Sequence, residues 1–347
     1  MAVQNLIELF DLKNEKLLKL KMKVLKRIVI YIKNTLPKKL NCKVFEIIDP
    51  HILISQSEVR SPYQSKIEDL VKEIKMKKKD KKNIKEIQQK KELLKELRIA
   101  SALPNDRKNM IKYNNYVLVS YLTIFSQLSK TQQFPNLLCN FLLHFEGACR
   151  FYEEKILWDI LSVLIEYLKS INQKERINVL KILEFCVSII QLGNKSSDVD
   201  ERSIVKVIYK FILSNIKFLS SDKFQDIDLL ITLLSKLLLD RKPLSNDVIS
   251  SFIKVMTMIC SESKNEKNVT LFLELIKKIF ERYLIVRRLL DSEENDENVE
   301  VFNKEIYDPY LSNALQTNIL RELNLVKNFF IGNTHLSKLI SSISNLA

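Results

Sequence analysis

The chain is 347 residues long, 46% of its residues are hydrophobic, and its formal net charge at neutral pH is +14. With only 3 Gly and 7 Pro it is poor in turn-forming residues, which predicts a mostly helical protein of one large or two ordinary domains. The glycines stand alone, outside any phosphate-loop pattern, so the composition disfavours nucleotide-binding enzyme folds.

The positive charge lies in the amino-terminal third. Residues 1–43 and 66–98 carry the whole net charge, and the rest of the chain holds equal numbers of acidic and basic residues. Apolar residues recur at helical spacing between Val24 and Ile32, which predicts a basic amphipathic helix that ends near Pro37. The second segment has few apolar residues around its run KMKKKDKK, which is typical of a long solvated helix or an extended arm.

Such a polycation gains affinity for phosphate backbones by releasing condensed counterions. RNA is the partner we expect, although DNA or an acidic protein would satisfy the same charge. The residues expected to contact RNA are Lys19, Lys23, Lys26, Arg27, Lys77, Lys78, Lys79, Lys81 and Lys82. Two alternatives stay open: a solvated charged helix that binds nothing, and a nuclear-import signal within the Lys-rich run.

From about residue 105 onward, apolar-periodic stretches of four or five turns alternate with short polar breaks. The helices expected lie near 106–129, 136–149, 153–170, 173–191, 201–219, 225–240, 246–261 and 266–290. Helical hairpins that recur at roughly 40 residues stack into a superhelix. The predicted fold is therefore all-α: an irregular HEAT/armadillo-like helical-repeat superhelix with a basic amino-terminal helical arm.

The expected organisation follows in chain order. It comprises a basic amphipathic helical region at 1–43, a linker and Lys-rich helix or arm at 44–104, a helical-repeat scaffold at 105–290, an acidic linker at 291–305, and carboxy-terminal helices at 306–347.

No pattern of catalytic or metal-binding residues stands out. The three histidines are far apart in sequence, and no serine lies in a glycine-flanked elbow. We expect no enzyme activity, no metal and no cofactor. The cysteines form no CxxC pair and are expected to be reduced core thiols: Cys42, Cys139, Cys149, Cys186 and Cys260. The acidic residues near the start and the lack of a long apolar run favour an intracellular, soluble protein without a membrane contact.

The stretch YDPYLSNALQTNILREL, near the end of the chain, allows two interpretations. Asp308 can cap a helix with Pro309 at its first position, and the leucines that follow supply an apolar face. The same stretch resembles the signature of the CCAAT-binding-factor family of nucleolar proteins, through Asp308-Pro309, Ser312-Asn313-Ala314 and Thr317. A second stretch, RKPLSNDVISSFIK, resembles a further pattern of that family through Arg241, Lys242, Ser245, Phe252, Ile253 and Lys254.

Within this family, the chain is most similar to the nucleolar complex-associated protein 3 group. The resemblance implies a non-enzymatic factor in the nucleus and nucleolus that serves the assembly and nuclear export of the large ribosomal subunit. It also implies a heterodimer with nucleolar complex protein 2, contact with the pre-60S particle, its rRNA and other assembly factors, and a partner-binding role for motif residues that include Asp308, Pro309, Asn313 and Ala314. The alternative is a nuclear helical-repeat adaptor in transport, chromatin or replication licensing.

Overall fold

The computed structural model describes residues 105–130, 135–171, 175–192, 201–240, 242–291 and 301–346, together with residues 23, 24, 26, 27, 30, 71 and 90–94. The chain forms two compact units, Met1–Glu153 and Glu154–Ala347.

In the first unit, α7 (Asn105–Lys130) packs along α8 (Pro135–Cys149). Their interface is aromatic: the Tyr121 and Phe145 rings are stacked with centroids 5.6 Å apart, and Phe141 lies 5.2 Å from Phe145. The hydroxyl of Tyr152 donates to the carbonyl of Leu118 at 2.6 Å, which fastens the segment after α8 to α7. Both helices agree with the sequence prediction.

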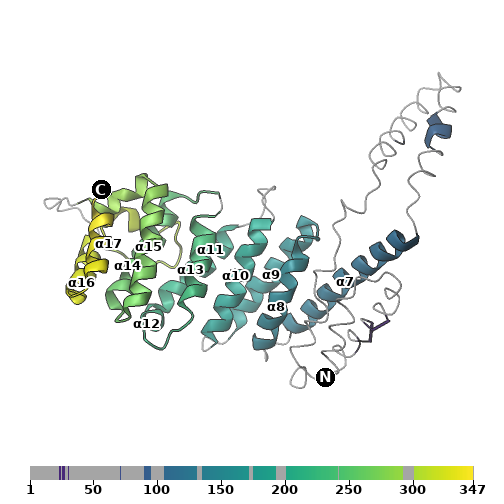
Figure 1. Cartoon of the computed structure of the whole chain (residues 1–347), viewed down its shortest axis with the longest axis horizontal. Helices are drawn as coiled ribbons and strands as arrows, with labels where there is room; N and C mark the ends of the chain where they lie inside the picture. The colour runs from purple at the N-terminus through teal and green to yellow at the C-terminus, as the bar shows by residue number, and fades with distance from the viewer. Residues whose placement is uncertain are drawn as a thin grey trace. The chain divides into compact units, whose positions relative to one another are not determined.

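The second unit contains the helices from α9 onward, which follow one another along the unit (Figure 1). They are α9 (Glu154–Ser170), α10 (Arg176–Leu192), α11 (Glu201–Ser214), α12 (Ile216–Leu219), α13 (Ile227–Leu238), α14 (Asn246–Glu262), α15 (Glu266–Arg282), the 3₁₀ helices η4 (Ile285–Leu290) and η5 (Ala314–Gln316), α16 (Leu320–Phe329) and α17 (Thr334–Ser344).

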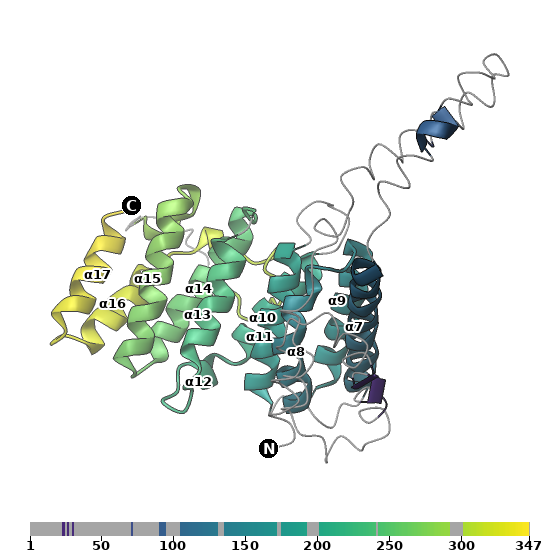
Figure 2. The ribbon, with the colours of Figure 1, turned by 45° about the vertical axis from the view of Figure 1, so that its right-hand side comes forward.

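These helices form two rows of hairpins. Helices α10, α13, α15 and α17 contact one another in that order along one row, and α11 with α12, α14 and α16 do so along the other. Cross-row contacts join α10 to α11, α14 to α15, and α16 to α17, the pair at the far end of the unit from α9 (Figures 1 and 2). The predicted all-α, helical-repeat fold is therefore confirmed, and no strand occurs among the residues that the structure describes.

Helix α14 is the most deeply buried element of this unit. Every residue from Val248 to Cys260 is buried, because α12, α15, α16, η4 and η5 surround it. A helix that is covered on all sides must also bury its polar residues, and α14 buries Ser250, Ser251, Lys254 and Thr257. The partners of these groups decide what lies around α14.

Two expected helices are interrupted. The helix predicted at 201–219 breaks at Asn215, whose side-chain amide donates to the Phe211 carbonyl at 2.8 Å, so that a short helix, α12, follows. A side chain that bonds to the backbone in this way competes with the regular helical hydrogen bonds. The sequence prediction of one continuous helix was wrong here.

The helix predicted at 266–290 ends at Arg282 and continues as η4. Tyr283 leaves the helical conformation at φ −117° and ψ 93°. Its hydroxyl donates to the Leu238 carbonyl at 2.9 Å, in the buried interior. Leu238 is the last residue of α13, and its carbonyl accepts no hydrogen bond within that helix. The residue at which α15 ends therefore supplies the hydrogen bond that the end of α13 lacks.

Four of the five expected core thiols are confirmed as free and buried; Cys42 lies outside the described residues. Burial raises the pKa of the Cys186 thiol to about 12. Burial also raises the pKa of Cys149 and Cys260 well above the usual value for a thiol. Reactivity requires the thiolate, so these side chains should be inert in the folded protein.

We predict that a Cys42→Ser variant at neutral pH will not react with a thiol reagent such as Ellman's reagent until it unfolds. Four thiols should then react in guanidinium chloride, because unfolding restores both access and an ordinary pKa. Absorbance measured with and without denaturant tests this. Rapid reaction of any thiol in the native protein would contradict the burial of that side chain.

Candidate functional site

The segment from Val301 to Ile319, here called the strap, connects to α16 and crosses the row that contains α11 and α14. Its regular structure is limited to the three-residue η5. The helix expected to begin at Asp308 and Pro309 does not form, and α16 begins only at Leu320. Instead, Asp308 Oδ1 accepts a hydrogen bond from the Tyr310 N–H at 3.1 Å, which makes a local turn. The helix-cap interpretation was therefore wrong.

Three cations of α11 hold one side of the strap. The Lys206 amine lies 2.8 Å from Asp308 Oδ2. The Arg202 guanidinium lies 5.3 Å from the centroid of the Tyr310 ring, and the Lys210 amine lies 5.8 Å from that of Tyr307. The contacts run in opposite directions along the two segments, so the strap lies antiparallel to α11 and meets one cation per helical turn.

Helix α14 holds the strap from the buried side. The hydroxyl of Ser251 lies 3.1 Å from the carbonyl oxygen of Pro309 and 2.7 Å from that of Asp247. One turn further on, the amine of Lys254 donates to the carbonyl of Asn318. The same amine lies 2.7 Å from Glu322 Oε1, in a pair whose side chains are only 7% and 18% exposed.

Asn313 gives the strap its internal shape. Its side-chain amide donates to the Val301 carbonyl at 3.0 Å, and its Oδ1 accepts from the Asn303 N–H at 3.1 Å. The neighbouring Ala314 is fully buried, where a larger side chain would have no room. Thr317 then donates to the carbonyl of Ala314 at 2.8 Å and closes the 3₁₀ turn.

The two stretches identified by resemblance are therefore in contact with each other. Phe252 and Ile253 are fully buried in α14, and the Phe252 ring meets that of Tyr209 edge-on at 5.5 Å. Lys242 and Ser245 are exposed before α14, whereas Arg241 lies outside the described residues. The contacts of Phe252, Ile253, Lys254, Asp308, Pro309, Asn313 and Ala314 lie within this chain, and a partner-binding role of the motif stays a prediction.

The basic residues expected to bind RNA are only partly described. Lys23, Lys26 and Arg27 are helical and exposed, and the Lys26 amine lies 5.6 Å from the centroid of the Tyr116 ring of α7, in the same unit. The residues outside the described part of the chain are Lys19, Lys77, Lys78, Lys79, Lys81 and Lys82.

Sequence reasoning missed the side of the site that α11 contributes. Arg202, Lys206 and Lys210 recur at four-residue intervals, which places them on one exposed face of a helix. This spacing was the available signal, but their partners lie about a hundred residues away in sequence, as for Lys206 and Asp308. Tyr209, on the buried side of α11, was also missed; burial raises its pKa to about 12, although the nearby hydroxyls of Ser312 and Ser251 oppose the shift.

The electrostatics of Asp308 favour its charged form. Partial burial raises the pKa of its carboxyl. The hydrogen bonds from Lys206 and the Tyr310 N–H, with the positive charges of Lys206 and Arg202, outweigh that effect and bring the pKa below its usual value.

Two searches of the described part of the chain found nothing. It contains no group of three or more His, Cys, Asp or Glu side chains placed to hold a metal ion. Likewise, no described helix has the length and apolar character to cross a membrane.

We predict that Lys254→Ala lowers the free energy of unfolding by about 3–5 kcal/mol, because it leaves the largely buried Glu322 carboxylate without its cation. Glu322 Oε2 has no hydrogen-bond partner among the described residues, so Glu322 depends on Lys254. The double variant Lys254→Met/Glu322→Leu should lie closer to the wild type than either single change. Urea unfolding measures all of these variants.

The matched control for that experiment is Lys267→Ala. Lys267 lies 3.9 Å from Asp228, with side chains 71% and 75% exposed. Such an exposed pair contributes less than about 1 kcal/mol. If Lys254→Ala lowers the free energy of unfolding no more than Lys267→Ala does, the buried contacts of Lys254 do not stabilise the fold as predicted.

We predict that Asp308 contributes stability that depends on pH. Its pKa in the folded protein is lowered, so the contribution is present above the unfolded pKa of about 3.9 and is lost as the pH falls through the folded pKa. Asp308→Asn should therefore destabilise the protein at neutral pH and much less at about pH 2.5. Unfolding curves at both pH values, with Asp228→Asn as the exposed control, test this; an equal loss at both values would contradict it.

Comparison with known proteins gives one family match, and the matched residues include this site. A search of curated proteins finds no match to the chain. The model of the CBF/Mak21 family matches residues 180–335, somewhat less than half of the chain, and the match includes α11, α14, the strap and α16. That family includes nucleolar complex protein 3 proteins, and its proteins are typically nuclear or nucleolar. The match does not distinguish between individual members of the family. The match suggests a nucleolar role related to ribosome biogenesis.

Proposed function

We propose that this chain is a non-enzymatic assembly factor for the large ribosomal subunit, which acts in the nucleolus on pre-60S maturation and export. The observation that carries the proposal is the CBF/Mak21 match over residues 180–335. This region contains both stretches that resemble nucleolar complex-associated protein 3, and the two stretches meet at the strap.

The helical-repeat architecture supports a scaffold role. Stacked hairpins expose long helical faces over two rows, and such faces suit the docking of other helical proteins. In this proposal the chain forms a heterodimer with a nucleolar complex protein 2 homologue, and together they bind the pre-60S particle and its other assembly factors.

The charge distribution supports a contact with pre-rRNA. The amino-terminal third carries the whole net charge of +14, and the remainder is neutral. Phosphate contacts by lysine and arginine release counterions and require no particular sequence. The basic arm would thus hold the particle through RNA while the carboxy-terminal unit binds protein.

We predict that five Lys→Glu changes in the arm weaken association with large-subunit precursors and leave the helical body folded. The changes are at Lys77, Lys78, Lys79, Lys81 and Lys82. Gradient sedimentation at two salt concentrations measures the association, and circular dichroism measures the fold. The salt dependence should also become shallower, because fewer counterions are released.

The matched control reverses five exposed lysines of the second unit and changes the net charge by the same amount. These are Lys155, Lys169, Lys217, Lys264 and Lys278. Equal weakening in the control would show that total charge, rather than the arm, governs the association.

Affinity purification of the tagged chain from native cells, with sequencing of the bound RNA, tests the function itself. Precursors of the large-subunit rRNA and one stoichiometric helical partner are the expected result. An RNA-free complex with import receptors or replication proteins would instead support a nuclear adaptor and overturn the proposal.

A further inference from the structure

The outward face of α16 carries two large exposed apolar side chains beside the polar ones of Arg321, Asn324 and Asn328. Leu323 and Val326 are buried against α14 and α17, whereas Leu325 and Phe329 are 52% and 61% exposed. Arg321, Leu325 and Phe329 recur at four-residue intervals and thus form one stripe on the helix. Ile331, just beyond the helix, is 80% exposed. Large apolar side chains that gather in this way on a surface mark an interaction site.

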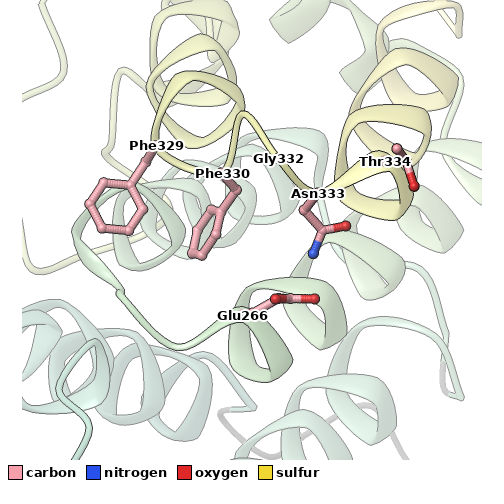
Figure 3. Close-up of a pocket in the computed structure, with 6 residues that line it drawn as sticks. All are labelled: Glu266, Phe329, Phe330, Gly332, Asn333 and Thr334. Carbon is pink, nitrogen blue, oxygen red and sulfur yellow. The ribbon is translucent and has the colours of Figure 1, made fainter.

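A pocket of about 440 Å³ lies beside the end of the stripe. Phe329 and Phe330 form its apolar wall, with ring centroids 4.9 Å apart. Across the pocket, Asn333 directs its side-chain amide nitrogen toward Glu266 of α15 (Figure 3). Asn333 Oδ1 is occupied, because it accepts the backbone N–H groups of His335 and Leu336. The pocket therefore joins an aromatic wall to a wall that offers a carboxylate.

The charge of the α16–α17 hairpin points to the kind of partner. Between residues 320 and 344, Glu322 is the only acidic residue, and it is paired with Lys254. The exposed charges that remain on these two helices are the basic ones of Arg321, which lies on the stripe, and of Lys327 and Lys338, which lie elsewhere on the hairpin. An apolar stripe that begins with an arginine, on a hairpin without a free acidic residue, is complementary to an amphipathic helix that has acidic flanks.

We propose that the surface formed by Arg321, Leu325, Phe329 and Ile331 docks an acidic amphipathic helix of a partner protein. An aromatic side chain of that helix, Trp or Tyr, enters the pocket and donates its N–H or O–H to Glu266. This inference rests on the proposed function, because it assigns a docking surface within the proposed heterodimer.

The same observations disfavour RNA as the occupant. RNA requires many cations on the contact face, whereas this stripe is mainly apolar.

A binding experiment on the purified full-length chain tests the surface directly. The probe is a synthetic, fluorescently labelled helical peptide with a leucine stripe, one tryptophan and glutamate flanks; a second peptide has lysine flanks. The glutamate peptide should bind, and the lysine peptide should bind at least about tenfold more weakly. Leu325→Asp/Phe329→Asp should weaken binding of the glutamate peptide about tenfold or more, since both side chains are exposed and their loss leaves the core intact.

The matched control is Leu284→Asp/Ile285→Asp. These two side chains are 65% and 60% exposed at another place in the same unit. This variant should bind the glutamate peptide as the wild type does, and circular dichroism melts should show that both double variants are folded. Equal loss of peptide binding in both variants would overturn the inference. So would a loss of binding to a single-stranded RNA oligonucleotide in Leu325→Asp/Phe329→Asp, because RNA would then occupy this surface.

A photo-crosslinking experiment identifies the natural occupant. With p-benzoylphenylalanine in place of Phe329, the crosslinked peptide from native cells should be an acidic, helix-forming segment of another protein. A crosslink to a second copy of this chain, to a basic segment, or to nothing would overturn the inference.

The two proposals fail in different ways. If the chain does not sediment with large-subunit precursors, the proposed function falls while the peptide affinity still stands. If it sediments with them but Leu325→Asp/Phe329→Asp leaves peptide binding unchanged, only the docking surface falls.

Discussion

The buried amine of Lys254 is the constraint on which the carboxy-terminal half of the second unit depends. A lysine in the middle of a covered helix is costly unless its charge is paired and its donors are used. The Asn318 carbonyl and the Glu322 carboxylate meet both needs. Both groups lie at the junction of the strap and α16, so pairing of Lys254 also fixes where α16 begins, and α17 packs on α16 in turn.

The strap explains why two separate stretches of sequence share one resemblance. The Ser251 hydroxyl contacts the Pro309 carbonyl, and the Lys254 amine donates to the Asn318 carbonyl. The two stretches therefore supply the two sides of one set of hydrogen bonds. Such a pattern describes how the fold is held together. The surface available to a partner consists of other residues, such as Leu325 and Phe329, which contribute little to holding these stretches together.

The positions of the helices could be predicted from the sequence, but the points where two of them are interrupted could not. Apolar periodicity located α7 to α15 closely, because most of these helices bury one face against their neighbours. The break at Tyr283 could not be predicted, since its cause is the carbonyl of Leu238, a residue 45 positions earlier. The same holds for the candidate site: Asp308 and Pro309 are a good local cap, but contacts with Lys206 and Ser251 favour a turn instead. Local rules fail where distant groups supply the hydrogen bonds.

The sequence distances spanned by the strap set the order in which this unit can fold. In an ordinary solenoid each hairpin contacts only its neighbours, so folding propagates from one repeat to the next. Here the Lys206–Asp308 contact closes a loop of 102 residues, and the Lys254–Asn318 contact closes one of 64. The entropy of closing such loops must be paid before the contacts form, so they belong to the late steps of folding. Until they form, α14 has an uncovered side, and the chain emerging from a ribosome carries this partly covered helix until the strap and α16 have been made.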